Sequence, residues 1–211
     1  MRFSAEATLP TRFGRFRVRA VQEHRKGKEH LVILRGRVRG KRDVPVRLHS
    51  ECLTGDVMGS LRCDCRDQLE KSLRLIEAQG AGVLIYLRQE GRGIGLMNKI
   101  RAYSLQEKGY DTVEANQRLG FEDDLRDYDL AVRILRALEI KSVALITNNP
   151  EKIAALAKGD IPVSRRIPLV VRPNRFNVGY LKTKRSKLGH LPDLKVGSSH
   201  SASSSKGGRK A

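Results

Sequence analysis

Residues 47–65 read Arg47-Leu-His-Ser-Glu-Cys52-Leu-Thr-Gly-Asp-Val-Met-Gly-Ser-Leu-Arg-Cys63-Asp-Cys65, and this window holds all three cysteines of the chain. Three thiolates so close in sequence favour one soft divalent metal ion, with zinc as the first choice. Three protein ligands leave one position of a zinc tetrahedron open, which is the arrangement of catalytic sites. The metal there lowers the pKa of a bound water to about 7. The window therefore predicts a hydrolytic zinc centre.

Other interpretations of this window remain open on the residues alone. A cysteine is often a small buried hydrophobe, and a Cys-x-Cys pair can be a redox pair. His49 lies three residues before Cys52 and could supply a fourth ligand that closes the site. The C-x10-C-x-C spacing matches no zinc-finger pattern, so it does not name a function by itself.

The chain carries a large excess of positive charge. Its 211 residues have a formal charge of +19 and 39% hydrophobic residues, which is enough for a sizeable core. The tail 195–211 holds four basic residues and no acid, so fifteen of the nineteen charges lie in the body. Such a balance indicates a polyanionic partner: nucleic acid, a membrane surface or a phosphorylated small molecule. Five Phe, five Tyr and no Trp argue against a stacking platform for single-stranded nucleic acid.

The chain shows no signal for membrane insertion or export. No stretch approaches about 18 consecutive apolar residues, and the N-terminus lacks the apolar region of a secretory signal. An odd number of clustered cysteines argues against a disulfide framework and for a reducing cytosol. We therefore expect a cytoplasmic protein that does not enter a membrane.

The first 50 residues predict a series of strands. Residues 6–22 alternate apolar and polar side chains around a turn at 10–14, which is typical of a hairpin. A charged turn at 23–29 precedes strands at 30–38 and 44–49. This succession predicts an antiparallel or mixed sheet.

The remainder of the chain alternates helices and strands. Residues 67–79 carry apolar side chains at helical spacing and stop at Gly80. Further strands are expected at 82–87 and 142–147, and further helices at 96–108, 127–138 and 150–157. We therefore expect a layered α/β domain over residues 1–194, with a mixed sheet and N-terminal antiparallel strands. Residues 195–211 are expected to form a disordered basic Ser/Gly-rich tail.

A glycine-rich loop lies between a predicted strand and a predicted helix. In Glu90-Gly-Arg-Gly-Ile-Gly95, glycine amides can approach a phosphate, and Arg92 can bind its oxygens in a bidentate manner. A plain tight turn is the commoner explanation of such a loop. With Arg92 inside it, the loop favours an anion site.

Two more polar clusters point to the same chemistry. Thr147-Asn-Asn149 ends a strand, at the edge where α/β sheets bind ligands, and Lys152 follows in the next helix. Lys152 is well placed for an anion, although it could also be a solvated surface lysine. Asp124 and Arg126 place a carboxylate beside a guanidinium, or belong to a simple charged loop. Taken with the cysteines, these clusters predict hydrolysis of a phosphorylated small molecule.

Four motifs resemble the GTP cyclohydrolase II family, over residues 6–192. They are His49-Ser-Glu-Cys-Leu-Thr-Gly-Asp56, Ser60-Leu-Arg-Cys-Asp-Cys65, Arg88-Gln-Glu-Gly-Arg-Gly-Ile-Gly-Leu96 and Tyr110-Asp-Thr-Val-Glu-Ala-Asn116. The resemblance implies the first committed step of riboflavin synthesis, in which the guanine imidazole ring of GTP is opened. Formate and pyrophosphate would leave, giving 2,5-diamino-6-hydroxy-4-(5-phosphoribosylamino)pyrimidine. The chain has no room for the synthase that some family members carry upstream, so we expect a monofunctional enzyme.

The resemblance also implies roles for individual residues. Cys52, Cys63 and Cys65 would bind one zinc ion per subunit. Tyr103 would act near the ring, Asp124 would accept a proton, and Arg126 would attack the α-phosphate or only clamp it. The positions that match GTP contacts are Arg47, Leu48, His49, Ser50, Glu51, Gln68, Glu90, Gly91, Arg92, Thr112, Thr147 and Lys152. Mg²⁺ on the triphosphate and a homodimer are implied as well.

Two alternatives to this function remain. A related cyclohydrolase could open the ring and retain the formyl group, although Tyr103 favours full deformylation. A basic zinc protein that binds RNA would account for the +19 charge. Glu51 could be only a salt-bridge partner, and Tyr103 only a core or rim aromatic. Arg66-Asp67, after the last cysteine, departs from the family pattern and could alter the electrostatics of the metal site.

Overall fold

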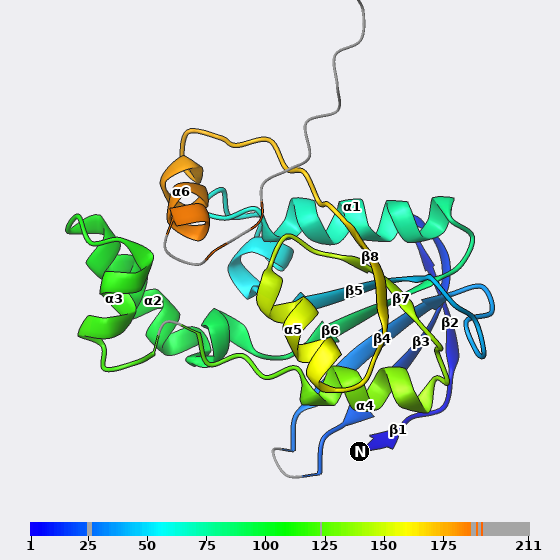
Figure 1. The fold of residues 1–211 in the computed structure, drawn as a ribbon. Coiled ribbons are helices and arrows are strands. Elements are labelled where there is room, and N and C mark those ends of the chain that lie inside the picture. Colours follow the sequence, from blue (N-terminus) through cyan, green and yellow to red (C-terminus); the bar gives the residue numbers. More distant parts are fainter. Residues whose placement is uncertain (25–26, 123, 187–188, 190, 192–211) are drawn as a thin grey trace, which may run out of the picture.

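The computed structural model describes residues 1–24, 27–122, 124–186, 189 and 191. They form one eight-stranded mixed sheet with helices on both faces (Figure 1). The strand order is β1-β3-β4-β6-β5-β7-β8, and β2 also pairs with β3. The strands are β1 (Arg2–Phe3), β2 (Ala7–Thr11), β3 (Gly14–Gln22), β4 (Glu29–Arg35), β5 (Val44–Ser50), β6 (Gly82–Leu87), β7 (Val143–Ile146) and β8 (Val163–Ile167).

The sheet changes character along the chain. All pairings among β1, β2, β3, β4 and β6 are antiparallel, whereas β5 pairs in parallel with both β6 and β7, and β7 with β8. The predicted α/β domain with N-terminal antiparallel strands and a mixed sheet is therefore confirmed. The parallel half is the part that aligns several strand ends at one edge.

The alternation of side chains along β6 explains the two cores. Val83, Ile85 and Leu87 belong to the larger apolar cluster, which contains the buried side chains of α4 (Asp129–Ala137) and Leu156 of α5 (Pro150–Lys158). Leu84 points to the other face and joins the smaller cluster with side chains of α1 (Cys65–Ala78). Burial on both faces accounts for the continuous apolar run of this central strand.

The other helices lie off the sheet. In Figure 1, α2 (Gly95–Glu107), α3 (Thr112–Arg118) and α6 (Val178–Ser186) lie together beyond one end of it. A single π-helical turn, η1 (Leu53–Val57), follows β5, and a short turn, η2 (Glu90–Gly93), follows β6. Both turns stand at the carboxyl ends of parallel strands, facing α2. None of the described helices is long and apolar enough to span a membrane.

Three sequence predictions need correction. The strand expected at 30–38 ends at Arg35, because Gly36 adopts a positive φ of 59° and turns the chain. The sequence did not reveal α3, which begins with a capping box between Asp111 and Glu114. The helix expected from residue 127 begins at Asp129, whose backbone N–H binds the Asp127 side chain.

The predicted tail at 195–211 and the boundary at residue 194 lie outside the described residues. They stay predictions.

Candidate active site

A cleft opens where β5, β6 and β7 end, between the sheet and the off-sheet helices. Arg47 comes from the middle of β5, Thr147 directly follows β7, and Tyr103 comes from α2. Val171 and Tyr180 of the C-terminal segment also line the cleft. The predicted site residues that line it are Arg47, His49, Ser50, Glu51, Cys52, Cys63, Cys65, Gln68, Glu90, Gly91, Arg92, Tyr103, Thr112, Arg126, Thr147 and Lys152.

Leu48 and Asp124 are the predicted residues that do not line the cleft. The Leu48 side chain is fully buried in the larger apolar core, and its carbonyl accepts a hydrogen bond of 2.7 Å from Lys152 Nζ. Asp124 is paired with Arg126 at the rim. Neither side chain is therefore placed as a direct contact of a ligand in the cleft.

The three cysteines come together at one end of the cleft. Their sulfur atoms all lie within 4.8 Å of one another, and Cys52 Sγ is 3.7 Å from Cys63 Sγ. A disulfide needs about 2.05 Å, so these are free thiols. Zinc–sulfur bonds of about 2.3 Å in a tetrahedron place sulfurs about 3.8 Å apart. The donor set and its spacing therefore fit a zinc ion.

The backbone of η1 packs directly against this sulfur cluster. A Cβ atom on Gly55 would lie 2.7 Å from Cys63 Sγ and 3.0 Å from Cys52 Sγ. Contacts this short are not tolerated between carbon and sulfur. Glycine at position 55 is thus required for the cysteines to converge.

His49 is not a fourth member of this ligand group. Its Nε2 atom lies 3.0 and 3.1 Å from the two Asp56 carboxylate oxygens, and its ring stacks on Tyr86. Asp56 also accepts hydrogen bonds from Tyr86 Oη and from the backbone N–H of Cys52. Burial lowers the pKa of His49, even though Asp56 acts in the opposite direction. The neutral ring therefore supports the cysteine segment through Asp56, and the group of possible metal ligands among the described residues consists of the three cysteines.

The glycine-rich loop after β6 has an unusual backbone. Gly91 and Arg92 both have positive φ angles, 62° and 58°, and for Arg92 this conformation is strained. Among the described residues, Arg92 Nη1 is buried without a hydrogen-bond partner. A buried guanidinium N–H at the wall of a cleft is a donor for an anionic ligand.

Arg47 lies deep in the same cleft. Its guanidinium donates to the Ile146 carbonyl at 3.0 Å and to Gln68 Oε1 at 2.6 Å, while Nε has no partner among the described residues. Burial lowers the pKa of Arg47 to about 10, so the group stays cationic at neutral pH. Asp64 and Cys65 act electrostatically on Arg47, and together with Arg92 it adds positive charge to the lining of the cleft.

Asp124 and Arg126 form a closely held ion pair. Arg126 Nε donates to both Asp124 oxygens, at 2.8 and 3.0 Å, and Nη2 bonds Asp124 as well. Burial acts to raise the pKa of Asp124, but the Arg126 bonds outweigh it and the pKa is lowered. Burial likewise acts to lower the pKa of Arg126, and the Asp124 bond outweighs it and raises that pKa. At neutral pH both groups are therefore charged.

Tyr103 reaches the cysteine end of the cleft from α2. Its Oη lies 3.4 Å from Thr54 Oγ1, and its ring lies beneath the cations of Arg62 and Lys99. Burial raises the pKa of Tyr103, so the side chain is a neutral phenol at physiological pH. It is a hydrogen-bond donor close to the sulfur cluster.

The remaining predicted residues take supporting positions. Ser50 Oγ accepts a hydrogen bond from Gln89, and Glu51 forms an ion pair of 3.5 Å with Arg88, as one interpretation of Glu51 allowed. Thr147 Oγ1 accepts from the Asn149 backbone, and Thr112 begins α3.

The sequence left the roles of Arg66 and Tyr110 open. Arg66 is paired with Glu70 one helical turn away, and Glu70 also pairs with Arg12, so the positive charge beside the cysteines is only partly compensated. Tyr110 stacks under Arg118 and is not a lining residue of the cleft.

Sequence reasoning gave no role to several lining residues, of which three stand out by their contacts or burial. Lys99 is 9% exposed and contacts Cys52; its spacing of four residues from Tyr103 on a predicted helix could have revealed it. Asn116 is buried at the cleft and belongs to the unpredicted helix α3. Tyr180 lies in a segment where no sequence pattern indicated a site, with its ring 6.0 Å from the Arg92 guanidinium.

Comparison with known proteins gives one consistent result. The profile of the family described as GTP cyclohydrolase II matches residues 2–168. The chain is 56% identical over 189 residues to GTP cyclohydrolase-2 of Picrophilus torridus, an alignment that covers 90% of this chain and 98% of the relative. It is 54% identical to GTP cyclohydrolase-2 of Campylobacter hominis, covering 89% and 93%. It is also 54% identical to the riboflavin biosynthesis protein RibBA of Bacillus subtilis, covering 88% of this chain and 47% of that protein.

Proposed function

Because the chain belongs to the GTP cyclohydrolase II family, we propose that it hydrolyses GTP, opening the guanine imidazole ring and releasing formate and pyrophosphate. The pyrimidine product would enter riboflavin biosynthesis. The observation that carries this proposal is one cleft lined both by three converging thiols and by two guanidinium groups, each with a buried N–H that has no partner among the described residues. The thiols suit a hydrolytic metal, and the guanidinium groups suit a polyphosphate.

The cysteine end fits the ring-opening half of the reaction. Cys52, Cys63 and Cys65 would hold zinc, which supplies an activated water for attack at C8 of guanine. Tyr103, a neutral phenol in this position, donates a hydrogen bond to the reacting ring and helps to orient it. Full deformylation needs two hydrolytic steps, the opening of the imidazole ring and the release of formate, and both would take place beside Tyr103.

The cationic end fits the triphosphate. Arg92 supplies a buried donor that has no partner within the part of the chain that the structure describes, and Arg47 of β5 and Lys152 of α5 contribute positive charge to the cleft. Such preorganised donors stabilise negative charge without reorganisation. Mg²⁺ bound to the phosphate oxygens would complete the neutralisation.

We propose that Arg126 acts on the α-phosphate mainly as a clamp. Its pKa is raised by the Asp124 pair, so the guanidinium keeps its proton and remains a donor rather than a nucleophile. The proposed role of Asp124 as a proton acceptor requires Arg126 to move towards the phosphate, because the bonds to Arg126 lower the pKa of this carboxyl. Binding of the phosphate would provide the competing anion.

The remaining predicted contacts are proposed as positioning groups. Gln68 orients Arg47, and Glu51, Ser50, Thr112 and Thr147 form the walls of the cleft. His49 and Leu48 act indirectly, through Asp56 and through Lys152. Glu90 and Gly91 shape the turn that presents Arg92.

We also propose a cytoplasmic homodimer. Apolar side chains are exposed on η1 and the loop after it and on α2, and this surface would suit a second copy of the chain. Those more than half exposed are Val57, Met58, Leu61 and Met97. Sedimentation of the full chain tests the dimer, and Met97→Glu should shift it towards monomer.

Product analysis tests the function. Purified protein is incubated with GTP, zinc and magnesium, and the products are identified by mass spectrometry. Formate, pyrophosphate and the diaminopyrimidine in equal amounts would support the proposal. A product that retains the formyl group would limit the chemistry to ring opening, and unchanged GTP with zinc bound would reject it.

A further inference from the structure

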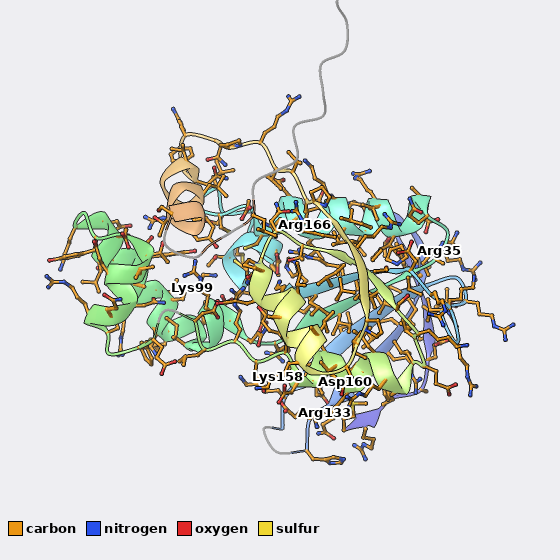
Figure 2. All side chains as sticks on the ribbon, in the orientation of Figure 1. Arg35, Lys99, Arg133, Lys158, Asp160 and Arg166 are labelled. Atoms are coloured by element: carbon orange, nitrogen blue, oxygen red, sulfur yellow. The ribbon has the colours of Figure 1, made fainter. Side chains whose placement is uncertain are left out.

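Lys99 is buried between two groups of the cysteine end. Its Nζ atom donates to Cys52 Sγ at 3.0 Å and to Glu90 Oε1 at 2.7 Å, and the residue is 9% exposed. Figure 2 labels Lys99, which belongs to α2 and lines the cleft. A buried ammonium is costly unless it is paired and hydrogen-bonded. The pair with Glu90 meets that requirement and fixes where the ammonium lies.

Glu90 is held on several sides. Its Oε2 atom accepts a hydrogen bond of 2.6 Å from the Leu53 backbone N–H, and Oε1 also accepts one from Gly91 N–H at 2.8 Å. The carboxylate therefore links the glycine-rich turn after β6 to the cysteine segment after β5. The position of the Lys99 ammonium is therefore set by a carboxylate that is itself held in place.

Three hydrogen bonds therefore restrain Cys52. Asp56 accepts one of 3.0 Å from the Cys52 backbone N–H, Glu90 accepts one from the backbone N–H of the following residue, Leu53, and Lys99 donates one to the Cys52 sulfur. Hydrogen bonds to a metal ligand set its orientation and tune how strongly it donates to the metal. An N–H donor on a thiolate withdraws electron density from the sulfur and so leaves the metal more electrophilic.

We propose that Lys99 is a positioning residue of the metal centre, which orients Cys52 Sγ and moderates its donation to the metal. This inference rests on the zinc site of the proposed function. It also assigns Glu90 to holding Lys99 and the Leu53 backbone rather than to direct contact with the nucleotide. Lys99 then connects the glycine-rich turn to the zinc ligands without touching the reacting atoms.

Metal binding without GTP tests this role. Lys99→Met keeps a long apolar stem and removes the donor that orients Cys52 Sγ. We expect the loss of orientation to outweigh the stronger donation from the sulfur, so zinc affinity should fall about 10- to 100-fold in competition with a chromophoric chelator. In the cobalt-substituted protein, the thiolate-to-metal charge-transfer band should shift. Lys99→Arg retains an N–H donor and should restore the band towards that of the unmodified protein. Lys108→Met, at an exposed site where α2 ends, is the matched control and should change neither quantity.

The outcomes separate this inference from the proposed function. A folded Lys99→Met protein with zinc affinity within twofold of the unmodified protein and the same cobalt spectrum would overturn the inference. If Lys99→Met does not fold, Glu90→Gln is measured instead: a shifted band supports the role, and an unchanged band rejects it. If the proposed zinc site is wrong, the unmodified chain itself binds no zinc, and this result is obtained before any variant is measured.

Discussion

The two ends of the cleft solve different problems. At the cysteine end, polar groups bind one another: Asp56 holds His49 and the Cys52 backbone, and Glu90 holds Lys99. At the cationic end, Arg92 Nη1 and Arg47 Nε are buried without partners among the described residues. Buried polar atoms in native proteins are normally satisfied. Around the cysteines, the buried carboxylates are therefore satisfied by protein groups and only His49 Nδ1 lacks a partner among the described residues, whereas we propose that an anionic ligand satisfies the two arginine donors.

This difference predicts which property each group of residues controls: metal binding for the cysteines and binding of an anionic ligand for the arginines. The cysteine end depends on packing distances of a few tenths of an ångström, as at Gly55. The cationic end depends on charge and donor direction. Glu90 and Lys99 join the glycine-rich turn to the cysteine segment, and Arg47 interacts electrostatically with Cys65, so the two groups are structurally linked. We therefore expect separate effects only from substitutions that remove a functional atom and leave this link in place.

The largest effect is expected from removing a metal ligand. Cys63→Ser should abolish stoichiometric zinc binding and reduce formate release to background, because two thiolates do not retain the ion. Zinc content by atomic absorption and formate by a coupled assay measure both. Binding of pyrophosphate, followed by thermal shift, should persist. A zinc-free Cys63→Ser protein that still released formate would reject the metal-dependent mechanism.

Next in size is Gly55→Ala. The new methyl group would lie 2.7 Å from Cys63 Sγ, so the sulfurs must separate, and we expect a stability loss of about 1–3 kcal/mol with weaker zinc binding. Urea unfolding and chelator competition measure the two effects. Gly179→Ala is the control, because a Cβ there meets nothing within 4 Å. Equal behaviour of the two variants would show that the close packing of η1 is unimportant.

A change at the cationic end should affect the substrate and not the metal. Arg92→Gln removes a charged donor, and charge-assisted hydrogen bonds are worth about 1.5–3 kcal/mol, so KM for GTP should rise roughly 10- to 100-fold. Zinc content should stay the same. Arg101→Gln, on the exposed side of α2, serves as the control. Loss of zinc from Arg92→Gln would show that the two effects are not separate.

The smallest expected effect concerns pH. Burial lowers the pKa of His49 below its ordinary value of 6.5. Below pH 6.5 the His49 side chain is therefore protonated in the unfolded state at pH values where it is still neutral in the folded state. The free energy of unfolding should therefore fall as pH falls through this window. His49→Gln should make that slope shallower, as measured by urea unfolding at a series of pH values. An unchanged slope would contradict the neutral, buried imidazole.

The sequence predicted the fold better than the contacts of individual side chains. The strands β6 and β7 and helix α1 were evident because burial imposes continuous apolar runs or helical spacing on them. Helix α3 was missed because it is short and is defined by a capping box rather than by an apolar face. Boundaries such as the end of β4 depend on backbone turns at single glycines.

The candidate site shows the same limit. The three cysteines were visible because metal ligands leave a compositional signature in one window. The contacts of Lys99 and Glu90 join residues far apart in the chain, and no local pattern encodes them. Leu48 was named among the positions that match GTP contacts in the family, yet strand alternation buries its side chain in the core.

The central claim is that a single metal at the cysteine cluster drives ring opening while the cationic end binds the phosphates. The most direct test titrates zinc into metal-free protein and measures formate release from GTP at each step. The account predicts a rate that rises linearly and saturates at one zinc per chain, with pyrophosphate binding unchanged throughout. Full formate release by the metal-free protein, or zinc saturation without any formate, would contradict it.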